Sequence, residues 1–462
     1  MRAHSLSARR AAVLAVAAGA AFAACKEVTV PNYNSPNVEQ LTGAPNASTM
    51  NTTVLGLLVG ARATVGTYAT GLGILGREVY NLDGAEPRNV LGYLVGPLEP
   101  GGFVADVGWT ATYRQVLTAT TILAGVDKVP EYTPAQKEGV KGLTKTFVAM
   151  AYIDQLRVRD TFGIVLDVDP DARQIGAFVT RDEGYARAAQ LLDEAKTHLQ
   201  AAGGAFPFVL HSGFAGFNTP ATFLRFNRAI KARLEVYRGR WQDALTALGE
   251  SFVSTASGSA AALATGAYHV YSTASGDAVN PLFDPAPRAL AAVPSFLTDA
   301  QRRADGSADL RASGKAVAGA VSLTTQGVTS NVRVTAYASN TAPVPIIKNE
   351  ELILLRAEAN LNLGNRAAAI EDINFVRVNS GGLAPLPATF SGDLIGELLY
   401  NRRYSLFDEY GHRWVDLRRY NRLGELPKTL PTHRVFPLVP IPVDECNQRN
   451  PAPRGCVQVS GF

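Results

Sequence analysis

The chain has 462 residues, of which 47% are hydrophobic and 18% are charged. These fractions are typical of an ordinary soluble globular protein, and at about 150 residues per domain the length predicts two or three sub-regions. The formal net charge of +4 is nearly balanced, so the chain lacks the positive field of a nucleic-acid-binding protein.

Residues 1–24 have the pattern of a secretory signal peptide. A positively charged start precedes residues 11–24, an uncharged run of small and apolar residues that is too short to span a membrane. The run leads into Ala-Phe-Ala-Ala-Cys, which resembles the lipobox of bacterial lipoproteins, with Phe22 where that pattern usually has Leu. We therefore expect the mature protein to begin at Cys25 and to carry lipid there. The alternative is an ordinary signal cleavage that leaves a free thiol.

Helical patterning dominates the chain after a polar N-terminal stretch. Residues 25–50 are rich in turn formers, which predicts an extended tether. Apolar residues recur at helical spacing in 141–159. Thr180 and Glu183 have the spacing of a capping box, which predicts the start of another helix. We expect residues 51–250 to form a helical region.

A loop predicted at residues 80–93 is the best local candidate for a ligand site. Sugars and peptides bind to aromatic rings flanked by hydrogen-bonding groups, because the ring covers the apolar face while polar groups fix the hydroxyls. The alternative is a solvated loop whose tyrosines pack on neighbouring helices. The candidate binding residues are Tyr80, Asn81, Asp83, Arg88 and Tyr93.

Two stretches, 232–245 and 357–370, share the frame of a helix–turn–helix hairpin. In each, a helix with small residues is followed by a turn glycine (Gly239 or Gly364) and then by Ala-Leu or Ala-Ile. Small residues let antiparallel helices approach closely, as in a tetratricopeptide repeat, although the copies are much further apart than the ~34 residues of that repeat. The alternative is two unrelated hairpins.

Residues 251–345 interrupt this pattern. They are rich in Ala, Ser, Gly and Thr, and only residues 332–338 alternate as a strand does. A structureless linker of that length is uncommon, so we expect an irregular, loop-rich lobe that packs on the helical scaffold. Helical patterning then returns in residues 346–462, which we expect to form a C-terminal helical region and tail.

Residues 396–420 combine helical spacing with charges of both signs. Structural ion pairing explains such a cluster better than a ligand site does, and we expect Trp414, like Trp109, to lie in the core. Beyond this segment, Cys446 and Cys456 are the cysteines besides Cys25. In an exported chain the pair predicts a disulfide that closes a short loop in the tail, while a metal site would need further ligands.

At this point the sequence resembles the SusD/RagB family of nutrient-binding outer-membrane lipoproteins. Residues 401–419 are similar to the family's Arg-rich motif with Gly-His-Arg-Trp followed by Asp-Leu-Arg-Arg, although Asn401 and Asp408 stand where the family usually has Glu and Ala. Three further segments match in family order, namely 151–163, 345–359 and 438–451.

This resemblance implies a mostly all-α fold, with a tetratricopeptide-type helical scaffold and an irregular lobe that presents the ligand face. It implies a non-enzymatic protein without a cofactor, which captures oligosaccharide at the bacterial cell surface. Its implied partner is a SusC-like TonB-dependent barrel transporter, over which it docks as a lid. A peptide ligand, a tetratricopeptide-type scaffold for protein partners and a secreted hydrolase are the alternatives.

Motifs for common enzyme chemistry give no support to the last alternative. The sequence contains no HExxH, Walker lysine motif or GxSxG elbow. Residues 71–76 match GxGxxG, but no strand is predicted before them, as a dinucleotide site requires. We expect His412 to be a structural histidine and predict no metal site.

Overall fold

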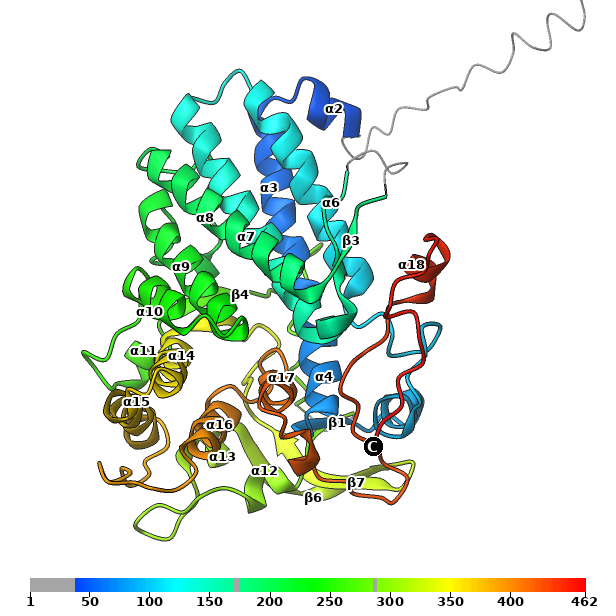
Figure 1. The fold of residues 1–462 in the computed structure, drawn as a ribbon, viewed down its shortest axis with the longest axis vertical. Helices are drawn as coiled ribbons and strands as arrows, with labels where there is room; N and C mark the ends of the chain where they lie inside the picture. Colours follow the sequence, from blue (N-terminus) through cyan, green and yellow to red (C-terminus); the bar gives the residue numbers. More distant parts are fainter. Residues whose placement is uncertain (1–37, 170–174, 286–288) are drawn as a thin grey trace, which may run out of the picture. The chain divides into compact units, whose positions relative to one another are not determined.

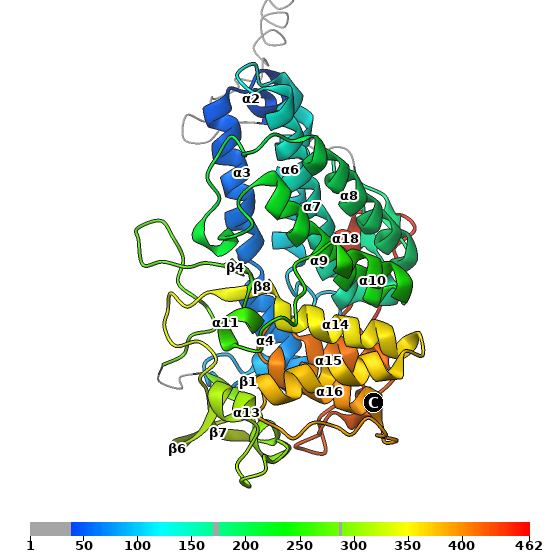
Figure 2. The same cartoon turned by 90° about the vertical axis from the view of Figure 1, so that its left-hand side faces the viewer.

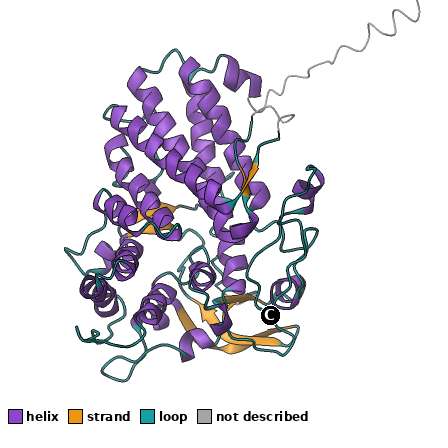
Figure 3. Cartoon of the chain, viewed as in Figure 1, coloured by secondary structure: helices purple, strands orange, loops and turns teal. Residues whose placement is uncertain are grey.

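Helices make up about half of the described residues and most of the regular structure (Figures 1 and 3). The computed structural model describes residues 38–169, 175–285 and 289–462, and Leu41–Phe462 forms one unit. Cys25, the expected signal peptide and residues 25–37 of the expected tether lie outside the described residues. The described strands are short and form four two-stranded sheets, so the expected mostly all-α class is confirmed. No helix within the described ranges is long and apolar enough to cross a membrane.

The boundary expected for the tether at residue 50 lies too far along the chain. Helix α2 spans Val38–Gly43 and helix α3 spans Ala47–Arg62. The Asn46 side chain caps α3 by accepting a hydrogen bond from the Thr49 backbone N–H at 2.9 Å. Met50 and Val54 on one face of α3 are fully buried in the core. Packing therefore orders the end of this stretch, although its polar composition predicted an extended tether.

Long antiparallel helices form the first part of the scaffold. Helix α7 (Pro134–Arg159) begins with a capping box at Thr133, and α8 (Arg181–Ala201) begins with the predicted box between Thr180 and Glu183. The other elements of this region are α4 (Val65–Leu75), β1 (Val79–Asn81), α5 (Arg88–Val90), the π-helix η1 (Leu91–Val95), α6 (Trp109–Gly125), η2 (Val126–Lys128), η3 (Asp160–Phe162), β2 (Ile164–Val165), β3 (Phe178–Val179) and η4 (Ser212–Phe214).

The two predicted hairpins are both present. Helix α9 (Pro220–Tyr237) turns at Gly239 into α10 (Trp241–Gly249), and α14 (Asn349–Asn362) turns at Gly364 into α15 (Arg366–Asn379). Both glycines have positive φ, 68° and 83°, which other residues adopt only with strain. Helix α10 packs on α14, so the hairpins are neighbours although the chain leaves the scaffold between them (Figure 2).

The interrupting segment contains more regular structure than the expected irregular lobe. Strand β4 (Gly266–His269) pairs antiparallel with β8 (Val344–Lys348), which brings the two ends of the segment together. Strand β5 (Leu290–Ala292) pairs with β1, about two hundred residues earlier in the chain. The strands β6 (Ala316–Thr325) and β7 (Val328–Val334) form a hairpin, and the helices are α11 (Ala260–Leu263), α12 (Ser295–Thr298) and α13 (Leu310–Lys315).

The C-terminal region closes the scaffold. Helix α16 (Leu394–Ser405) packs on α14 and α15 (Figure 2), and α17 (His412–Arg419) packs on α16 and on α4 (Figure 1). The tail contributes η5 (Leu423–Glu425) and α18 (Val443–Asn447). The predicted disulfide between Cys446 and Cys456 is present, with the sulfur atoms 2.07 Å apart.

Candidate functional site

The loop singled out in the sequence begins in strand β1 and ends in the π-helix η1. Because β1 pairs with β5, the start of this loop is attached to the lobe. The loop then turns at Asp83, whose carboxylate oxygen Oδ1 accepts a hydrogen bond from the Ala85 N–H at 2.9 Å. Asn81 Oδ1 accepts a weaker bond from the Asp83 N–H at 3.2 Å. The loop therefore has a fixed conformation set by its own amides and carboxylates.

The two tyrosines of this loop, expected as candidate ligand-binding residues, lie in the core. Tyr80 is 1% exposed, and its hydroxyl bonds to Thr429 Oγ1 at 2.8 Å. Tyr93 is 6% exposed and lies against Gly71 of helix α4. A methyl group at Gly71 would come within 2.8 Å of the Tyr93 hydroxyl oxygen, so the glycine makes room for this ring. Packing on neighbouring elements, the alternative interpretation, describes both side chains.

The polar members of the predicted set remain accessible to solvent. Asn81 and Asp83 are half-buried, while Arg88 is exposed and forms an ion pair with Glu86. Their contact with a ligand stays a prediction.

One exposed aromatic ring beside this loop was absent from the predicted set. Phe103 is 42% exposed. The Arg88 guanidinium carbon lies 4.6 Å from the centre of the Phe103 ring, and Tyr93 meets the same ring edge-on at 6.2 Å. Among the described residues, the only other aromatic side chain that is largely exposed is Phe462. The signal in the sequence was Pro100-Gly101-Gly102, a turn-forming sequence directly before an aromatic residue.

We call Glu86, Arg88 and Phe103 the Phe103 platform. An exposed ring offers the apolar face on which the C–H face of a sugar can stack, while the guanidinium donates and the carboxylate accepts hydrogen bonds from hydroxyls. The Arg88 hydrogen bonds to Glu86 hold the pKa of the Glu86 carboxyl below its ordinary value, so this carboxylate stays an acceptor at neutral pH. The platform is thus equipped for binding.

The Arg-rich C-terminal motif is a packed structural element, as predicted. Arg402 is 1% exposed, and its Nε donates to Asp416 Oδ2 at 2.6 Å. The Trp414 ring is fully buried, donates from Nε1 to the Phe436 carbonyl oxygen at 2.8 Å, and carries the Arg418 guanidinium 4.4 Å above its centre. Burial also holds the pKa of His412 well below its ordinary value, so this histidine is neutral. These groups hold helices together and are not free to meet a ligand.

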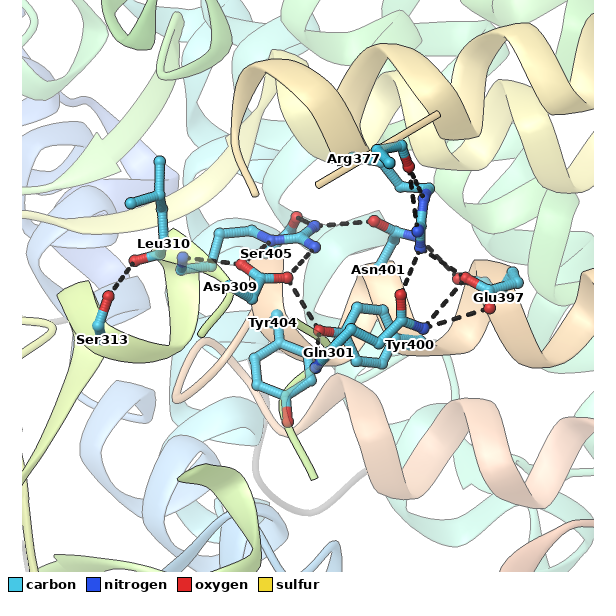
Figure 4. A network of polar contacts seen from close by, with 12 residues as sticks. Gln301, Asp309, Leu310, Ser313, Arg377, Glu397, Tyr400, Asn401, Tyr404 and Ser405 are labelled. Carbon is cyan, nitrogen blue, oxygen red and sulfur yellow. Dashed lines mark hydrogen bonds and ion pairs between the residues drawn. The ribbon is translucent and has the colours of Figure 1, made fainter. Parts of the chain in front are cut away.

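A second polar network attaches the lobe to the scaffold (Figure 4). Arg311 of α13 pairs with Asp309 and donates from Nη1 to Asn401 Oδ1 at 2.9 Å and to Ser405 Oγ at 3.1 Å. Gln301 of the lobe likewise bonds to Arg377 of α15 at 2.8 Å. Asn401, one of the two departures from the family motif, is therefore one of several residues of α16 that contact the lobe.

The chain thus combines a helical scaffold with repeated hairpins, an inserted lobe and an exposed aromatic ring. The family model of the SusD family matches residues 319–450, which include the Arg-rich motif, the segment 345–359 and all but the last residue of 438–451. The C-terminal region thus matches the SusD family, and the chain has the fold of solved SusD-like structures, as the resemblance predicted. A search of curated proteins finds no match.

Solved structures agree over nearly the whole chain. A SusD-like protein from Bacteroides fragilis is 15% identical with a TM-score of 0.67, covering 92% of this chain and 99% of its own. A laminarin-binding SusD-like protein is 16% identical with a TM-score of 0.64, covering 90% and 100%. Surface glycan-binding protein A from Bacteroides uniformis is 14% identical with a TM-score of 0.65, covering 87% and 99%. At these identities the likeness shows the fold.

Proposed function

We propose that this protein is a cell-surface lipoprotein that captures oligosaccharide and delivers it to a SusC-like TonB-dependent transporter in the bacterial outer membrane. The proposal rests on the SusD family region, on the lipobox-like junction before Cys25 and on two relatives whose names state glycan binding, one of them for laminarin. Neither Cys25 nor a transporter belongs to the described structure, so anchoring and delivery rest on the sequence and the family.

The observation that supports sugar capture best is the Phe103 platform. Phe103 is held out of the core by a glycine-rich turn, although burying its ring would be favourable by about 2 kcal/mol. Arg88 and Glu86 lie beside it and form hydrogen bonds to each other. We expect a saccharide to stack on Phe103 and to bond to Arg88, Asp83 or Asn81.

Calorimetric titration of a panel of neutral oligosaccharides, beginning with β-1,3-glucan hexasaccharide, tests this site. We expect Phe103→Ala to weaken binding by about tenfold or more, since stacking on one aromatic ring is of the order of 1–2 kcal/mol. Phe462→Ala is the matched control, because it removes the other largely exposed ring.

Three results would contradict the proposal. Equal affinity of Phe103→Ala and the wild type would move the site elsewhere. Binding of peptides in place of all saccharides would favour the peptide-binding alternative. Purification of the protein from detergent-solubilised outer membranes without any barrel transporter would contradict delivery and would favour a tetratricopeptide-type scaffold for other partners.

A further inference from the structure

A cavity of about 790 Å³ opens in the helical scaffold, formed by elements other than those of the Phe103 platform. Its walls are the start of α8, the turn from α9 to α10, the end of α14 and the end of α17. We call it the α10-turn cavity. The turn exists because Gly239 takes a positive φ of 68°, after which the Arg240 N–H bonds back to the Glu235 carbonyl at 2.9 Å. This reversal places Arg240 and Trp241 at the cavity.

Aromatic side chains line the α10-turn cavity. Trp241 and Tyr420 are each partly exposed, whereas Tyr185 and Tyr237 are buried. The Tyr237 side chain is only 9% exposed, and its hydroxyl has no hydrogen-bond partner in the part of the chain that the structure describes. A buried hydroxyl without a partner is costly and uncommon in native proteins. Trp241 and Tyr420 are therefore the aromatic rings of this lining that a ligand in the cavity can reach.

Positive charge exceeds negative charge along the same lining. Five arginines and two aspartates line the cavity. Acidic partners hold two of these arginines in place, since Arg418 Nε lies 2.9 Å from Asp160, itself in the lining, and Arg419 bonds to Asp416 at 3.2 Å. Arg240 differs, because it is exposed and makes no ion pair with any described residue. Its guanidinium is therefore available to an anion.

The second hairpin provides an internal comparison. Its turn has the same glycine geometry at Gly364, but Asn365 and Arg366 occupy the positions of Arg240 and Trp241. A turn of this kind therefore requires neither an arginine nor a tryptophan. The two residues at the α10-turn cavity are an addition to the hairpin frame.

We propose that the α10-turn cavity is a second ligand site, which takes a carboxylated saccharide unit. Trp241 and Tyr420 stack on the sugar ring, and Arg240 pairs with the carboxylate through its planar fork. This chemistry differs from that of the Phe103 platform, where Glu86 already neutralises Arg88. The inference goes beyond the proposed function and stands on other residues.

Titration of the full chain with a galacturonate trisaccharide tests the proposal, with the fully methyl-esterified trisaccharide as the uncharged control. We expect the acid to bind and the ester to bind at least tenfold more weakly, because the ester cannot form the charge-assisted hydrogen bonds. Trp109 and Trp414 are buried, so a change in tryptophan fluorescence on binding reports on Trp241. That change should be absent in Trp241→Phe.

Arg240→Glu is the decisive variant, because it changes an exposed side chain and leaves the fold intact. We expect it to weaken binding of the acid at least tenfold, whereas Arg114→Glu, the same change on the exposed face of α6, should have no such effect. Phe103→Ala should leave binding of the acid unchanged, which separates this test from that of the proposed function. Equal binding of acid and ester, equal binding of a hexaglutamate peptide, or full affinity in Arg240→Glu would each overturn the proposal.

Discussion

The buried residues Trp414 and Asp408 affect the stability of the fold in different ways, because their surroundings in the core differ. Trp414 combines a buried ring, an indole hydrogen bond and a stacked guanidinium from Arg418. Asp408 is also buried, but one of its carboxylate oxygens has no hydrogen-bond partner among the described groups. Burial and the nearby charge of Glu409 raise the pKa of Asp408 to about 8. The first residue stabilises the fold at any pH, whereas the second makes stability depend on pH.

Trp414→Ala should lower the free energy of unfolding by about 3–5 kcal/mol, since a buried indole leaves a large cavity when it is removed. Denaturant unfolding measures this loss. Oligosaccharide binding by the folded variant should stay close to wild type, because Trp414 contacts core groups. Loss of binding without loss of stability would show that the Arg-rich motif is a ligand site.

Asp408→Asn should flatten the dependence of stability on pH. The folded pKa of Asp408 lies above its ordinary value, so the folded state holds a proton that the unfolded chain releases near pH 4. The stability from this group is complete below about pH 4 and is lost as pH rises through about 8. Asparagine cannot ionise and tolerates the positive φ of 57° at this position.

Thermal or urea unfolding between pH 4 and pH 9 measures this effect. As pH rises across this range, we expect the free energy of unfolding of the wild type to fall by a few kcal/mol relative to that of Asp408→Asn. The fall should be at most about 1.4 kcal/mol per pH unit. Parallel stability profiles for the two proteins would show that Asp408 is ionised in the folded state.

At the scale of elements, the lobe depends on contacts that lie far apart in the chain. The pairing of β1 with β5 and of β4 with β8 fixes its edges. The Arg311 network fixes its centre on α16, with Asp309, Asn401 and Ser405 all buried (Figure 4). Because these side chains are polar and shielded from water, removing one of them leaves the others without hydrogen-bond partners, which is costly.

Arg311→Ala should therefore lower the free energy of unfolding by about 3–5 kcal/mol, because it leaves the Asp309 carboxylate buried without its ion-pair partner. The double variant Arg311→Met with Asp309→Leu removes both charges and should recover much of that loss. Denaturant unfolding of the two variants checks the order. A double variant less stable than Arg311→Ala would show that the pair itself, and not the orphaned charge, determines stability.

At the scale of the whole molecule, a folded unit follows an N-terminal segment for which we propose a role in export and lipid attachment. Cys25→Ser should release the protein from the membrane fraction of cells, since burial of acyl chains contributes about 0.8 kcal/mol per CH₂ and surface contacts contribute far less. Fractionation followed by immunodetection measures the change, with the circular dichroism spectrum as a control for folding. Unchanged membrane retention of the folded variant would refute anchoring at Cys25.

The sequence by itself determined the features that depend on neighbours along the chain. Gly239 and Gly364 mark the two hairpin turns because only glycine adopts their backbone conformation without strain, and Thr180 with Glu183 marks the start of α8 because a capping box is local. Cys446 and Cys456 could be paired because exported cysteines close in sequence form short loops.

Only the tertiary structure decided which side chains reach the surface. Tyr80 and Tyr93 have the neighbours of a ligand loop, but β5 pairs with the strand that carries Tyr80, Thr429 bonds to its hydroxyl, and Tyr93 packs against Gly71 of α4. Phe103 contacts Tyr93 and Arg88 of the same region and remains 42% exposed. Burial is a sum of contacts between segments remote in sequence, and a periodic pattern records only that a residue can be buried, not whether a partner is there to bury it.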